Sequence, residues 1–180
     1  MKEVEVKIIE IDRGKVEAKL RELGATKTLD DDMDTIFFDF PGNPISKAKN
    51  LLRLRRIGDK TALTFKKFVE SDTAKVRVEY EVSVSDFETA NSILQSLGLI
   101  TTLRMEKHRT SYRLGKEASV EVDIDKYSGE YSHIPTLLEI EGADITTVHE
   151  QAKMLGYEPD RCKSWTTFDL IDYYSGKKLT

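Results

Sequence analysis

Like-charged side chains recur at every second position in several short segments of this sequence. Residues two apart on a strand lie on the same face, where like charges repel. A sheet selected for stability alone should therefore alternate its signs. The grouping instead favours a polyanion bound by several bases, together with divalent metal ions bound by several carboxylates. The acidic pairs are Glu3 and Glu5, Glu79 and Glu81, Asp123 and Asp125, and Glu139 and Glu141; the basic pairs are Arg53 and Arg55, and Lys107 and Arg109.

A triphosphate carried with Mg²⁺ or Mn²⁺ has this charge composition. Arginine grips phosphate oxygens with two N–H groups, lysine adds a point charge, and hard metals take carboxylate oxygens while keeping bound water. Cys162 is the only cysteine, which excludes an internal disulfide, a zinc knuckle and a CxxC redox pair. We therefore expect oxygen atoms to supply most ligands of any bound metal. No GxxxxGK segment is present, so a P-loop nucleotide site is excluded.

The elements that position these residues follow from the hydrophobic pattern. Strict alternation of apolar and polar residues predicts strands over 3–11, 35–40, 51–56, 61–67, 75–84, 105–114, 118–125 and 137–142. Apolar residues at helical spacing predict helices over 12–24, 86–98 and 145–156, and a fourth around 165–171. Polar loops are expected at 25–34, 41–50 and 69–74. No linker is evident, which predicts one α+β domain over residues 1–180.

Two arrangements satisfy a sheet with one aliphatic face and one ionic face. In an open sheet, helices cover the aliphatic side and the ionic side is a solvated surface laced with cross-strand ion pairs. In a closed eight-stranded antiparallel barrel, helices pack on the outside and the charged interior forms a tunnel with room for one small ligand. The order of the charges favours the tunnel, whereas the alternation alone favours the open sheet.

The amino-acid composition limits the kinds of molecule that the protein is expected to bind. Lys and Arg number 28 against 32 Asp and Glu, a net charge of −4, so no broad cationic surface for nucleic acid is expected. The sequence has no apolar run of about 20 residues and starts without an apolar signal segment, which predicts a cytoplasmic protein that does not enter membranes. The partner expected is a small triphosphate, and a homodimer is compatible with the sequence.

The chain resembles the CYTH family, the triphosphate tunnel metalloenzymes that include class IV adenylate cyclases and thiamine or inorganic triphosphatases. The family's ExExK signature stands at residues 3–7, and LRLRR, TALTFKK, VRVEYEV, EKHRTSYR, VEVDID and LLEIEG follow in the family's order. The resemblance covers essentially the whole chain. It implies an eight-stranded closed tunnel, a divalent metal, Mg²⁺ or Mn²⁺, and a triphosphate substrate.

The resemblance also implies roles for individual residues. Metal ligands would be Glu3, Glu5, Asp123, Asp125, Glu139 and Glu141. Phosphate-binding residues would be Lys7, Arg53, Arg55, Lys66, Lys107, Arg109 and Arg113, with Lys7, Arg55 and Lys107 as the catalytic residues among them. Glu79 and Glu81 would either bind metal or neutralise neighbouring arginines.

Four functions remain open at this stage. The preferred one is metal-dependent hydrolysis of a nucleoside triphosphate, thiamine triphosphate or inorganic tripolyphosphate. An adenylate cyclase would use the same tunnel residues and release cyclic AMP and pyrophosphate. A non-catalytic module that binds polyphosphate or nucleotide could dispense with the carboxylates, and a purely structural barrel should alternate its charges.

Overall fold

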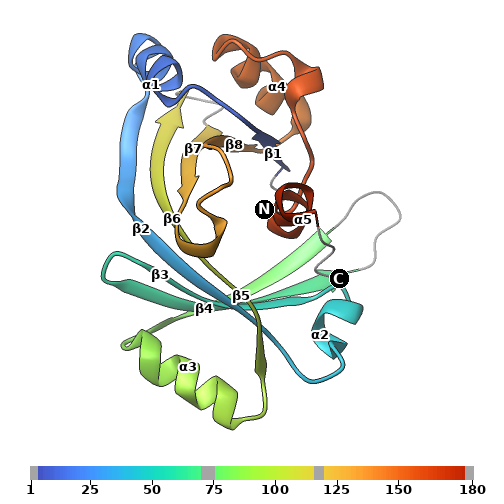
Figure 1. Cartoon of the computed structure of the whole chain (residues 1–180). Helices are drawn as coiled ribbons and strands as arrows, with labels where there is room; N and C mark the ends of the chain where they lie inside the picture. Colours follow the sequence, from blue (N-terminus) through green and yellow to red (C-terminus); the bar gives the residue numbers. More distant parts are fainter. Residues whose placement is uncertain (1–3, 70–75, 116–119, 177–180) are drawn as a thin grey trace. The chain divides into compact units, whose positions relative to one another are not determined.

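The computed structural model describes residues 4–69, 76–115 and 120–176 and contains one sheet of eight antiparallel strands with helices packed outside it (Figure 1). The strands are hydrogen-bonded in the order β1-β8-β7-β6-β2-β3-β4-β5. Their bounds are β1 Val4–Ile8, β2 Thr26–Asp39, β3 Leu51–Ile57, β4 Lys60–Val69, β5 Val76–Val84, β6 Ile100–Leu114, β7 Val120–Tyr127 and β8 Leu137–Gly142. The helices are α1 Arg13–Glu22, α2 Pro44–Lys47, α3 Phe87–Ser96, α4 Ile145–Met154 and α5 Thr167–Ser175, with 3₁₀ turns η1 Gly129–Tyr131 and η2 Pro159–Arg161.

The predicted architecture is confirmed except for its closure. The strand order ends at β1 and β5, and no pairing joins these two strands among the described residues. The outer edge of β1 is instead used by the chain after η2. There the Lys7 N–H donates to the Lys163 carbonyl and the Lys163 N–H donates to the Lys7 carbonyl, both at 2.8 Å. The expectation of a closed barrel therefore overstated the structure.

The chain is divided into two compact units. The first unit joins the segments before residue 32 and after residue 106, and the second unit comprises residues 32–106. The chain leaves the first unit within β2 and returns to it within β6. The single domain over residues 1–180 stays a prediction.

The core of the first unit lies on the aliphatic face of its strands. Ile8 of β1, Ile124 of β7 and Ile140 of β8 are fully buried there. Leu20 of α1 and Val148 of α4 pack into the same cluster. Each helix has an aspartate N-cap: the Asp12 carboxylate accepts the Lys15 N–H and the Asp144 carboxylate accepts the Thr147 N–H. Alternation along the strands then turns the polar side chains to the opposite face.

In the second unit, α3 covers the aliphatic face. Leu54 of β3 is fully buried and shares a cluster with Phe38 of β2 and with Phe87 and Leu94 of α3. Beyond β2, the Asp39 carboxylate accepts the backbone N–H groups of Ile45 and Ser46 at 2.9 and 2.8 Å, which ties down the turn that contains α2.

Two strands are much longer than predicted. The loop expected at 25–34 is wrong, because β2 begins at Thr26 and runs through it; β6 likewise begins at Ile100 and not at Met105. These additions carry polar residues on both faces, so they lack the alternation of a half-buried strand. Side-chain contacts support them instead: the Asp30 carboxylate accepts from Lys27 and Thr110, and Arg104 donates twice to Asp34.

Smaller differences concern the ends of the predicted strands, loops and helices. β1 ends at Ile8 and not at residue 11, and the loop predicted at 41–50 contains α2. The C-terminal helix begins at Thr167, after Trp165, because Thr166 and Asp169 form a reciprocal capping box. Most of the loop predicted at 69–74 lies outside the described residues.

Candidate active site

The polar face of the first unit gathers a buried ionic cluster. Its members come from β1, β6, β7 and β8, and those on β1, β7 and β8 lie next to core residues along their strands. Lys7, Lys107, Asp125 and Glu139 are between 0 and 8% exposed, which is rare for charged side chains. We call this set the first cluster; its residues are Glu5, Lys7, Lys107, Arg109, Asp123, Asp125 and Glu139.

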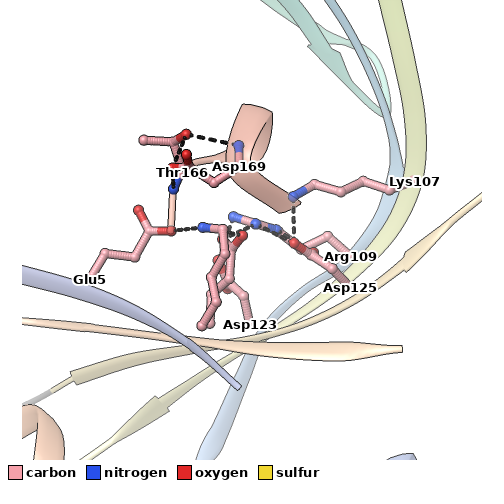
Figure 2. A network of polar contacts seen from close by, with 9 residues as sticks. Glu5, Lys107, Arg109, Asp123, Asp125, Thr166 and Asp169 are labelled. Carbon is pink, nitrogen blue, oxygen red and sulfur yellow. Dashed lines mark hydrogen bonds and ion pairs between the residues drawn. The ribbon is translucent and has the colours of Figure 1, made fainter. Parts of the chain in front are cut away.

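Arg109 is the centre of the first cluster (Figure 2). Its Nε donates to Asp125 Oδ1 at 2.7 Å and its Nη2 to Asp125 Oδ2 at 2.6 Å, a two-pronged contact. The guanidinium also pairs with Asp123 and Glu139. One arginine therefore balances carboxylates from two neighbouring strands, β7 and β8.

The two lysines flank this centre. Lys7 Nζ lies 2.9 Å from a Glu139 oxygen and also donates to Glu5. Lys107 Nζ donates to Asp125 and lies 5.6 Å from the ring centroid of Tyr127. The strand register produces these contacts, because Lys7 is opposite Glu139 and Lys107 is opposite Tyr127.

Burial and charge shift the protonation of the cluster in opposite directions. Burial, aided by the neighbouring Arg109 charge, lowers the pKa of Lys107. Burial also acts to lower the pKa of Lys7, but Glu139 and Glu5 outweigh it and raise that pKa. Burial acts to raise the pKa of Glu139, but Lys107, Arg109 and Lys7 hold it well below its ordinary value. Burial raises the pKa of Asp123 to about 6 despite the nearby Arg109.

Cross-strand pairing changes one step of the sequence reasoning. Asp123 and Asp125 repel one another along β7, but Arg109 on the adjacent β6 pairs with both. Charges therefore alternate between strands, and the like-charged pairs do not by themselves require a bound ligand.

The second unit carries a smaller ionic group on its own polar face. Lys66 Nζ lies 2.8 Å from Glu79 and Arg53 lies 3.7 Å from it, while Thr64 Oγ1 donates to Glu81 at 2.8 Å. Burial acts to raise the pKa of Glu79, but Lys66 and the nearby arginines lower it. The contacts of Glu79 favour the charge-balancing role over metal binding.

The remaining predicted residues are placed less centrally. Arg55 is partly buried on β3, two positions from Arg53, and Glu141 is opposite Glu5 in the β1–β8 register. Arg113 is exposed near the end of β6, opposite Glu121. Glu3 lies outside the described residues. The structure thus brings together the residues of each unit, and a single cavity shared by all the ionic faces stays a prediction.

The donor chemistry of the first cluster suits a hard divalent cation. Asp123 Oδ1 is buried and accepts no hydrogen bond, so it is an acceptor with an unused lone pair. The other carboxylates are held by Lys7, Lys107 and Arg109 and would have to exchange partners. Accordingly, no group of three or more acidic, histidine or cysteine side chains in the described segments is arranged as a metal cage.

The chain belongs to the CYTH domain family, which it matches over residues 1–159. A protein of Methanocaldococcus jannaschii named "Putative adenylate cyclase MJ0240" is 28% identical over 155 residues, which are 86% of this chain and 84% of that protein. A conserved hypothetical protein from Pyrococcus furiosus has a similar structure, with a TM-score of 0.73 at 24% identity over 94% of this chain and 100% of that one.

A third relative has an activity stated in its description, which applies to that protein and not to this chain. HpAC1 from Hippeastrum is named "Putative adenylyl cyclase" and described as having a dominant triphosphatase activity; its TM-score is 0.64 at 16% identity, over 98% of this chain and 97% of that one. Both structural similarities support the fold only. Within the described residues, no helix has the length and apolarity needed to cross a bilayer.

Sequence reasoning missed one member of the charged face. Tyr127 follows Asp125 by two positions, so the same alternation that identified Asp123 and Asp125 places it beside them. The alternation signal is present in the sequence, but a tyrosine carries no charge and so does not stand out from the apolar residues of the strand. Burial, with the charges of Glu139 and Asp125, raises the pKa of Tyr127 well above its ordinary value.

Proposed function

We propose that this protein hydrolyses a triphosphate substrate with the help of a divalent metal. The substrate class is a nucleoside triphosphate, thiamine triphosphate or inorganic tripolyphosphate. The observation that carries the proposal is the convergence of Lys7, Lys107 and Arg109 in one buried cluster with carboxylates. Membership of the CYTH family, whose members are metalloenzymes acting on triphosphates, supports the same activity.

The charge of the first cluster supports a metal requirement. Three bases face four carboxylates, which leaves a formal charge of −1 before any substrate arrives. A triphosphate adds several negative charges, so it would enter such a site together with cations. Glu5, Asp123 and Glu139 would hold the metal. Glu5 is exposed, Asp123 Oδ1 accepts no hydrogen bond, and the Glu139 carboxylate is paired with Lys7. The bound metal would supply Lewis-acid stabilisation of charge on the phosphate oxygens.

The chain's own bases would bind and orient the phosphates. Lys7, Lys107 and Arg109 would exchange carboxylate oxygens for phosphate oxygens, with Arg109 using the same two-pronged geometry that it uses on Asp125. Arg53, Arg55, Lys66 and Arg113 are proposed to add further phosphate contacts. This binding positions the terminal phosphorus for in-line attack by water, and Lys7, Arg55 and Lys107 offset the charge that develops on it.

One assay tests the activity. The protein is incubated with tripolyphosphate, ATP or thiamine triphosphate and Mg²⁺ or Mn²⁺, and phosphate and cyclic AMP are both followed. Release of phosphate alone supports the proposal. Retained binding without either product would identify a non-catalytic module and refute it.

A charge-removing variant connects the activity to the first cluster. Lys107→Met should lower kcat/KM by roughly 100- to 1,000-fold, because it removes one cation from the developing charge. The fold should survive, since Arg109 still pairs with Asp125. Lys19→Met is the matched control, because Lys19 lies on α1, outside the first cluster, and pairs with Glu22. Equal loss of activity in both variants would contradict the assignment.

A second function is favoured by the name of the M. jannaschii relative. In an adenylate cyclase the ribose 3′ hydroxyl would attack the α phosphorus of ATP and release pyrophosphate, using the same bases to hold the phosphates. Cyclic AMP formed from ATP in the assay above, with pyrophosphate measured alongside in equal amount, would establish this reaction in place of hydrolysis.

A further inference from the structure

Tyr127 is the uncharged member of the ionic face. It lies at the end of β7, opposite Lys107 in the β6–β7 register, and its side chain is only 1% exposed. The Lys107 ammonium lies over its ring, 5.6 Å from the centroid. The ring therefore helps to hold a buried cation in place by a cation–π contact.

The hydroxyl group of Tyr127 is a buried donor with no hydrogen-bond partner. Thr167, the first residue of α5, is near enough for its side chain to serve as a weak hydrogen-bond partner that acts to lower the pKa of the phenol. It does not reach normal hydrogen-bond geometry, so the phenol O–H has no well-formed hydrogen bond. Leaving a buried hydroxyl without an acceptor is unfavourable, and such groups in native proteins call for an explanation. A ligand that brings its own acceptor would provide one.

The surroundings of the hydroxyl indicate the chemistry of that ligand. Asp125 and Glu139 are near enough to interact with the phenol, yet their oxygens are directed to Arg109 and the lysines. Phosphate oxygens that displaced these carboxylates from the bases would lie beside the Tyr127 phenol. The phenol still carries its proton at neutral pH. A phosphate oxygen is then an acceptor within the same cluster.

We propose that the Tyr127 hydroxyl donates a hydrogen bond to a phosphate oxygen of the bound triphosphate, while its ring keeps Lys107 beside the same phosphate. The inference rests on the proposed function and extends it, because it adds a neutral donor to a site otherwise built from charges. It assigns Tyr127 to substrate binding through one atom, Oη.

Removing that atom separates a binding role from a structural one. Tyr127→Phe keeps the ring and therefore the contact with Lys107. We expect the thermal midpoint of unfolding to stay the same or rise, because an unsatisfied buried donor is lost. Affinity for tripolyphosphate, measured by calorimetry, should fall roughly 10- to 100-fold, the usual worth of a hydrogen bond to a charged group. KM should rise more than kcat falls.

Two control variants distinguish a binding role of the Tyr127 hydroxyl from a structural one. Tyr112→Phe removes the same atom from a tyrosine in the aliphatic core of the first unit and should leave affinity unchanged. Thr167→Val removes the nearby hydroxyl of α5, which acts to lower the pKa of the phenol. If Tyr127→Phe and Thr167→Val lower the midpoint equally and leave affinity intact, or if Tyr127→Phe fails to fold, the hydroxyl is structural and the inference is overturned.

The outcome for the wild type separates this inference from the proposed function. Wild-type protein that hydrolyses tripolyphosphate, with Tyr127→Phe binding it equally well, refutes the role of Tyr127 alone. Wild-type protein that neither binds nor hydrolyses tripolyphosphate in the presence of Mg²⁺ or Mn²⁺ refutes both.

Discussion

Replacement of Arg109 by methionine tests whether the first cluster is electrostatically balanced as the structure shows. The guanidinium pairs with Asp123, Asp125 and Glu139, and its side chain is only 14% exposed. Removing one partner of a buried ion pair typically costs about 3–5 kcal/mol, because the other charge stays buried and uncompensated. Asp123 loses its ion pair, whereas Asp125 keeps Lys107 and Glu139 keeps Lys7, so we expect a loss within that range.

The expected loss is large enough to measure by thermal unfolding. For a chain of 180 residues, each kcal/mol corresponds to roughly 2–4 °C, so Arg109→Met should lower the midpoint by roughly 6–20 °C at neutral pH. Lys19→Met is the surface control, because Lys19 pairs with Glu22 on α1 at 38% exposure. An exposed pair of this kind is worth about 1 kcal/mol at most.

Two further measurements identify the cause of the loss. In acid, carboxylates become neutral and no longer need the missing positive charge, so the difference in midpoint between Arg109→Met and the wild type should narrow. Added Mg²⁺ should also narrow it, because a divalent cation can replace the missing positive charge. A midpoint within a few degrees of the wild type, at all pH values, would show that solvent screens these charges and would refute the reasoning.

Two other substitutions test the framework around the clusters. Asp39→Asn should cost about 1–3 kcal/mol at pH 7, because burial opposes the charge of Asp39 but the N–H groups of Ser46 and Ile45 outweigh burial and lower its pKa. Because the pKa of Asp39 is lower in the folded state, ionised Asp39 stabilises the fold at pH values above its unfolded-state pKa. This stabilisation is lost as the pH falls through the folded-state pKa. Urea titrations should therefore show that the stability difference between Asp39→Asn and the wild type vanishes in strong acid. Gly142→Ala should cost about 1–3 kcal/mol in the same titrations, since its Cβ would lie 3.0 Å from Val120 Cγ1 and 3.2 Å from Val148 Cγ2; an unchanged midpoint would show that the core yields there.

The part of the fold that the sequence predicted is the part with an aliphatic face. Alternation identified β1, β3, β7 and β8 because each places one side in a core. The first half of β2 has no such side, and acidic residues there resemble a loop until the partners of Asp30 and Asp34 are known. Such partners come from distant positions, so no local pattern reveals them.

The candidate site was predictable as a set of residues but not as a set of contacts. Alternation correctly placed Lys7, Arg109, Asp125 and Glu139 on one face. Which acid pairs with which base depends on strand register, which the pattern of one strand does not contain. For this reason the pattern of single strands suggested that the like-charged pairs need a bound ligand, whereas the structure shows that bases on the neighbouring strand pair with them.

The strand order has a consequence for how the chain is synthesised. Residues 32–106 form an uninterrupted segment that leaves the ribosome early and contains the whole of β3, β4 and β5. In contrast, Val4 of β1 pairs with Gly142 of β8, so β1 lacks its strand partner until β8 has been synthesised. Contacts between such distant positions form slowly, and during translation β1 would remain available to chaperones or to other nascent chains.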